Sequence, residues 1–187
     1  MDFFPHFFQV DYRTLLTGDA TFSVIWASPP CNSYSGLKQN VTQAELDHAD
    51  RICYRVREIV AYWAAKNSDL RAYVENPWGS KNSLDKRKVF CGFGYDEHVT
   101  SWCKYGSHVR KNSLIYSFND PSAAGAIKLR CSKENCPWIA AGHTHHRKRV
   151  RGGEPKNRVV PSSQGSMTRL KDRHAVPAKL IRGLLLK

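Results

Sequence analysis

The sequence predicts an α/β fold: a mostly parallel sheet with helices on its faces, followed by a basic C-terminal extension. A long amphipathic pattern separates two short apolar runs, which is typical of a βαβ crossover. Residues 1–127 are nearly neutral, with 14 Lys and Arg against 13 Asp and Glu. Residues 128–187 carry 15 against 3, so almost all of the net charge of +13 lies in the last third of the 187 residues.

The first strand is predicted at residues 22–28, an apolar and β-branched run that ends in two prolines. A helix is predicted over 42–65. Thr42 and Glu45 have the spacing of a capping box, and apolar residues then recur every three or four positions. This strand and helix form the first two parts of the crossover.

A second buried strand is predicted at 70–75, parallel to the first because a helix connects them. Two more strands are expected at 98–105 and 112–118. A short terminal helix is expected at 177–186, since proline favours the first turn of a helix.

The carboxyl ends of the first two strands carry the candidate reactive residues. Cys31 follows Pro29 and Pro30 on a stiff loop, and Glu75 precedes Asn76 at the end of the second strand. In open parallel sheets, ligands bind outside the carboxyl ends of the strands. A lone loop cysteine or a lone acid usually has no such role, but their matching placement favours one shared site.

These strand ends resemble motifs of the DNA (cytosine-5) methyltransferases, in the compact style found in bacteriophages and other viruses. Residues 27–35 resemble the family's Pro-Cys nucleophile loop, and residues 74–77 resemble its Glu-Asn motif. Weaker matches follow the family's order. Residues 105–116 resemble its basic motif, 173–181 its closing helix, and 10–15 a cofactor-contacting segment.

The resemblance implies a truncated Rossmann-like methyltransferase sheet and a role for each matching residue. The Cys31 thiolate would add to C6 of a cytosine flipped out of double-stranded DNA. Glu75 would act at ring N3 and Arg110 would hold O2, with Lys111 as the alternative occupant of that place. The methyl group would pass from S-adenosylmethionine to C5, with Asp11 and Pro29 as cofactor-binding residues.

The basic extension predicts a nucleic-acid partner, because clustered Lys and Arg displace counterions from phosphates. The alternative is a solvated tail or a targeting signal. We divide the chain into a partial catalytic domain, 1–127, and a basic DNA-contacting region, 128–187. The predicted DNA-contacting residues are Ser33, Ser35, Lys111, Arg147, Lys148, Arg149 and Arg151.

A zinc site is predicted within the basic region. Cys131 and Cys136 precede His143 and His145, which together supply four ligands of the kind that tetrahedral zinc takes. The alternative is that the two cysteines are ordinary thiols and the histidines belong to the basic patch. Cys103 carries no motif and is expected to be a packing residue.

No segment of the chain matches the family's glycine-rich cofactor turn, and two or three of the usual seven strands have no counterpart. The first strand is therefore expected to form an exposed edge of the sheet. A second copy or a partner chain is expected to cover it. The alternative cover is the aromatic segment at residues 3–8.

The leading hypothesis is an S-adenosylmethionine-dependent DNA (cytosine-5-)-methyltransferase. The alternative is a catalytically inactive nucleic-acid-binding or assembly protein built on half of that fold, and a weaker third is an RNA-directed enzyme. No stretch approaches the ~20 apolar residues of a membrane span, and the start does not resemble a signal peptide. We therefore expect an intracellular protein of the cytoplasm or nucleoid, or of the host nucleus if it is viral.

Overall fold

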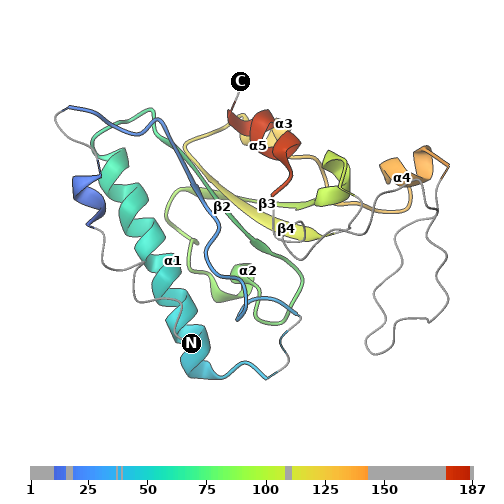
Figure 1. Ribbon diagram of the computed structural model, residues 1–187, viewed down its shortest axis with the longest axis horizontal. Helices are drawn as coiled ribbons and strands as arrows, with labels where there is room; N and C mark the ends of the chain where they lie inside the picture. Colours follow the sequence, from blue (N-terminus) through green and yellow to red (C-terminus); the bar gives the residue numbers. More distant parts are fainter. Residues whose placement is uncertain are drawn as a thin grey trace.

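The computed structural model describes residues 11–15, 19–36, 38, 40–107, 111–142 and 176–185. Four strands and several helices of very different length make up this part of the chain (Figure 1). In chain order they are η1 (Tyr12–Thr14), β1 (Val24–Ala27), α1 (Gln43–Ala64), β2 (Arg71–Pro77), α2 (Leu84–Arg87), β3 (Tyr95–Ser101), η2 (Trp102–Tyr105), β4 (Asn112–Phe118), α3 (Ala123–Ala126), α4 (Pro137–Ala140) and α5 (Ala178–Leu185).

The four strands form one open sheet in the order β1-β2-β4-β3. β1 and β2 are parallel, whereas β4 is antiparallel to both β2 and β3. The fold is therefore mixed α/β, and the prediction of a mostly parallel sheet is wrong. Only residues 102–111 join β3 to β4, fewer than the dozen or more that a parallel crossover needs, so the chain reverses direction there.

The predicted crossover from β1 through α1 to β2 is confirmed. α1 begins with the predicted capping box. The Glu45 N–H donates to Thr42 Oγ1 at 3.3 Å, and the Thr42 N–H donates to Glu45 Oε2 at 2.9 Å. In the pairing of β1 with β2, Ala27 lies opposite Val74. Because the strands are parallel and in this register, the segments that follow them emerge at the same edge of the sheet.

Helices cover both faces of the sheet, as predicted. On one face, Leu46 and Cys53 of α1 share a buried cluster with side chains of β2 and β4. On the other face, Leu180 and Leu184 of α5 share a buried cluster with Tyr73 of β2. Figure 1 shows α1 running along one side of the sheet, with α5 beside α3 near the other. The predicted terminal helix therefore belongs to the packed core.

The predicted strand at 98–105 is wrong in its second half. β3 begins earlier, at Tyr95, and ends at Ser101, after which residues 102–105 form the 3₁₀ helix η2. η2 ends at Gly106, which has a φ of 87° that favours glycine. This tight turn brings the chain back to β4, whose bounds match the prediction of 112–118.

β1 is one of the two edge strands, as the sequence predicts, and its four residues are half-buried. In the part of the chain that the structure describes, no helix is both long and apolar enough to cross a membrane. The division of the chain between residues 127 and 128 stays a prediction.

Candidate active site

The carboxyl edge of β1 and β2 brings Cys31, Glu75 and Lys111 into electrostatic contact. Cys31 is half-buried on the loop after β1. Burial is the main cause that raises the pKa of the Cys31 thiol, and the Glu75 carboxylate raises it further, while the Lys111 ammonium lowers it. Both charged groups therefore act on the Cys31 thiol, and they are paired with each other, with Lys111 Nζ 3.4 Å from Glu75 Oε1.

Glu75 is held in place by two groups from the start of β4. Its side chain is buried, at 4 % exposure. Ser113 Oγ donates a hydrogen bond to Glu75 Oε1 at 2.6 Å, and Lys111 Nζ lies 3.4 Å from the same oxygen. A buried carboxylate needs such partners, because an unpaired one costs several kcal/mol. The carboxylate is therefore fixed in position as well as charge-paired.

Lys111 is itself positioned by an aromatic ring. Its ammonium lies 3.8 Å from the centroid of the Trp102 ring, and the backbone N–H of Trp102 donates to the Lys111 carbonyl at 2.9 Å. A cation over an indole face is stabilised by the ring quadrupole. The sequence assigned Lys111 to DNA contact and only secondarily to the place of Arg110. In the structure, Lys111 forms an ion pair with Glu75.

The Cys31 loop is tied to both neighbouring elements. Asn76 Nδ2 donates to the Pro29 carbonyl at 3.1 Å, which joins the end of β2 to the loop. The backbone N–H groups of Tyr34 and Ser35 donate to the Cys31 carbonyl at 3.1 and 2.8 Å. These bonds close a turn directly after Cys31, so its side chain leaves a rigid backbone.

Tyr34 anchors this turn in the core beneath it. The side chain is fully buried, and its hydroxyl donates to Asp50 Oδ1 at 2.8 Å and lies 3.5 Å from Cys53 Sγ. Asp50 also forms a salt bridge with Arg87 at 2.5 Å. Burial raises the pKa of Tyr34 well above its usual range, so the hydroxyl stays a neutral donor. The network therefore holds the loop without adding a charge at the site.

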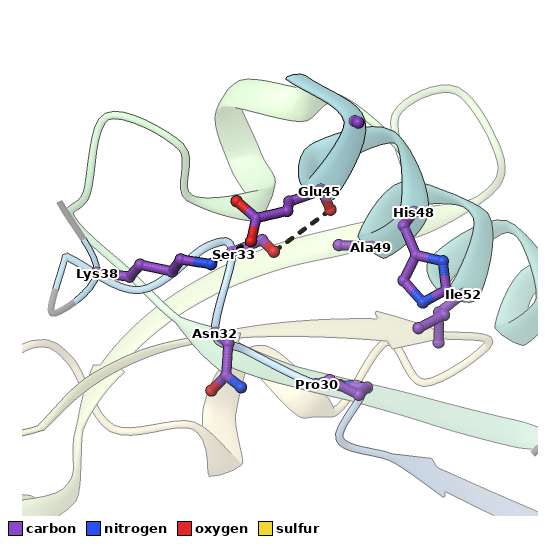
Figure 2. A pocket seen from close by; sticks show the side chains of 9 residues that line it. Pro30, Asn32, Ser33, Lys38, Glu45, His48, Ala49 and Ile52 are labelled. Carbon is purple, nitrogen blue, oxygen red and sulfur yellow. Dashed lines mark hydrogen bonds and ion pairs between the residues drawn. The ribbon is translucent and has the colours of Figure 1, made fainter. Parts of the chain in front are cut away.

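A cavity of about 360 Å³ lies between this loop and the start of α1. Figure 2 shows Asn32 and Ser33 on the loop side and Glu45 and His48 on the helix side, with the bond from Ser33 Oγ to the Glu45 carbonyl, 3.3 Å long, across it. Ser33 thus lines a cavity, and its role in DNA contact stays a prediction. Ser35 is half-buried in the turn.

The two predicted cofactor-binding residues do not form one visible site. Asp11 is exposed, and its carboxylate caps η1 by accepting the Arg13 N–H at 2.9 Å. Pro29 is buried and lines an apolar groove of about 290 Å³ beside β1. The described lining of this groove includes Arg55 and no carboxylate that could hold ribose hydroxyls. The described residues therefore do not make a complete site for S-adenosylmethionine, and we derive no step through it.

Cys131 and Cys136 lie together, and Cys103 joins them in a buried cluster that the sequence did not predict. Burial and the neighbouring thiol of Cys131 raise the pKa of Cys103 to about 12. Burial opposes ionisation of Cys136, yet the N–H groups of Ile139 and Trp138 lower its pKa. Among the described residues, no group of three or more His, Cys, Asp and Glu side chains is placed so that it could hold a metal ion.

Several predicted residues lie outside the described residues: Arg110, His143, His145, Arg147, Lys148, Arg149 and Arg151. Zinc binding therefore stays a prediction, since two of its four predicted ligands are among them. The phosphate-contacting role of the basic block stays a prediction for the same reason.

Sequence reasoning missed Ser113 and the anchoring role of Tyr34. The available signal for Ser113 was a serine within an apolar strand. Such a strand is buried, as Ser113 is in the structure, and a buried hydroxyl needs a hydrogen-bond partner. No protein-family model matches the chain, and no curated protein matches it either.

Proposed function

We propose that this protein is a DNA (cytosine-5-)-methyltransferase-like enzyme in which Cys31 is the nucleophile. The observation that supports it best is the meeting of Cys31, Glu75 and Lys111 at one edge of the sheet. A thiolate needs a nearby cation, and cytosine needs a hydrogen-bonding acid at N3 while the thiolate adds at C6. This edge offers both groups beside the thiol.

The proposed reaction begins with the cytosine out of the DNA stack. The Cys31 thiolate forms a bond to C6, and the electron pair gained by the ring makes C5 nucleophilic. By the resemblance, S-adenosylmethionine would supply the methyl group that C5 accepts and would leave as S-adenosylhomocysteine. Loss of the C5 proton then returns an electron pair to the ring and releases Cys31. Glu75, held by Ser113, carries in this step the proton that it shares with N3, because N3 is an acceptor and an ionised carboxylate has no proton to donate to it.

We interpret the crossover of β1, α1 and β2 as part of a truncated Rossmann-like sheet. The open edge of β1 and the incomplete groove beside it favour a second copy or a partner chain that completes the cofactor site. The proposed substrate is double-stranded DNA, gripped through its phosphates by the basic extension.

A second candidate is a catalytically inactive nucleic-acid-binding or assembly protein. Burial outweighs Lys111 and leaves the pKa of Cys31 raised, which disfavours the thiolate in the free protein. The absence of a carboxylate from the described lining of the groove beside β1 points the same way. The two candidates differ in whether a covalent bond to cytosine ever forms.

A covalent trap separates them. In 5-fluorocytosine the C5 proton is replaced by fluorine, so an enzyme that has added Cys31 and transferred methyl cannot eliminate. The protein is incubated with duplex DNA containing this base and labelled S-adenosylmethionine. A labelled, denaturant-stable protein–DNA band is the expected result. Its absence while DNA is still bound contradicts the proposal.

Two cysteine variants control the trap. Cys31→Ser should abolish the band and keep DNA binding. Cys91→Ser removes an exposed thiol that has no role in the proposal, so it should keep the band. A band that survives in Cys31→Ser would assign the chemistry to another residue.

A further inference from the structure

Leu129, between α3 and α4, projects into solvent although it is apolar. Its side chain is 78 % exposed, the largest value among the exposed large hydrophobic residues that the structure describes. Single exposed apolar residues are common on protein surfaces and need no explanation by themselves. What distinguishes this one is its neighbours, Lys128 and Arg130, and the rigid backbone that presents it.

The backbone on either side of this leucine is fixed by three hydrogen bonds. The Lys128 N–H donates to the Tyr105 hydroxyl at 2.8 Å, and the Lys128 carbonyl accepts from Thr100 Oγ1 at 2.5 Å. The Arg130 carbonyl accepts from Asn135 Nδ2 at 3.1 Å. These bonds hold the backbone on both sides of Leu129, and its side chain is exposed.

This segment is also next to the candidate active site. The Arg130 guanidinium lies 4.8 Å from the centroid of the Trp78 ring. Trp78 directly follows the Glu75-Asn76-Pro77 segment, and its N–H donates to the Asn112 carbonyl at 3.1 Å. The segment that carries the exposed leucine thus reaches the end of β2 through one aromatic contact.

We propose that Leu129 is a wedge that enters the base stack of duplex DNA, with Lys128 and Arg130 on the flanking phosphates. The inference rests on the proposed function, because a base leaves the duplex only if its stacking is broken. Apolar side chains are used by DNA-bending proteins to part neighbouring base steps. Cations on both sides hold such a wedge against the backbone.

The first test compares the covalent trap on two substrates, duplex and single-stranded DNA that carry 5-fluorocytosine. Leu129→Ala should slow adduct formation on the duplex by about tenfold or more, since unstacking costs a few kcal/mol. It should leave the single-stranded rate unchanged, because no stack has to be opened. Phe93→Ala, which truncates another apolar side chain that is 52 % exposed, should affect neither rate. Equal rates for wild type and Leu129→Ala on the duplex, or equal losses on both substrates, overturn the wedge.

The second test needs binding but no chemistry. A pool of duplexes carries 2-aminopurine at varied positions, and the emission of this base rises when it is unstacked. Wild type should raise the emission, Leu129→Phe should keep the rise, and Leu129→Ala should lose it. Wild-type binding without a rise, a rise that Leu129→Ala preserves, or failure to bind the duplex overturns the wedge. A rise without any covalent adduct contradicts the proposed function alone.

Discussion

Replacing Ser113 by alanine should slow covalent addition to cytosine with little change in DNA binding. Ser113 Oγ lies 2.6 Å from Glu75 Oε1, and both side chains are buried. A hydrogen bond to a charged group contributes about 1.5–3 kcal/mol. If Glu75 needs this bond to face the base in the transition state, the rate should fall by about 10- to 150-fold. Glu75 keeps its ion pair with Lys111, so the protein should still fold.

The assay is the single-turnover rate of adduct formation on 5-fluorocytosine DNA, at protein concentrations that saturate binding. Ser117→Ala is the matched control. Ser117 is also fully buried on β4 and loses a bond of similar length, 2.8 Å to His98 Nε2, far from the site edge. Both variants should stay folded, with the larger loss of stability in urea for Ser113→Ala because its bond is to a charged group, and only Ser113→Ala should react slowly. Equal rates for the two variants would refute the positioning of Glu75 by Ser113.

Four further predictions follow from the structure. The adduct rate should rise with pH through and above the usual thiol range, because the pKa of Cys31 is raised. Lys111→Met should move this profile to higher pH, because Lys111 lowers that pKa. Tyr34→Phe should lose about 1.5 kcal/mol of unfolding free energy with the bond to Asp50, and so about 3–6 °C in Tm by calorimetry. Light scattering at micromolar concentration should give a dimer, or a complex once a partner chain is added, and a monomer alone in both cases contradicts a covered β1 edge. The purified protein should contain zinc by metal analysis, and zinc that stays bound in Cys131→Ser contradicts the predicted site.

The crossover could be predicted because its signals are local. The capping box at Thr42 and the apolar repeat along α1 lie within one stretch of chain. The order of the strands could not be predicted in this way, because it depends on which distant strands pair. β4 inserts between β2 and β3, and no property of residues 112–118 alone distinguishes that place from the edge.

In the candidate site, too, some residues could be predicted from local signals and others depend on which strands pair. Cys31 could be identified because it follows a strand that leads into two prolines, and Glu75 because it lies near the end of a strand that closes with Pro77. Lys111 and Ser113 reach Glu75 only because β4 pairs with β2 so that Ser113 lies opposite Pro77. That register follows from the antiparallel insertion of β4. A sheet predicted as mostly parallel therefore could not place these two residues at the site.

The most direct test of the account is the identity of the residue that carries the trapped base. After reaction with 5-fluorocytosine DNA and S-adenosylmethionine, nuclease and protease digestion leaves one modified peptide for mass spectrometry. The account predicts that Cys31 carries a 5-methyl-5-fluoro dihydrocytosine adduct. DNA-bound protein whose Cys31 peptide stays unmodified under the same conditions, with a partner chain supplied, would contradict it.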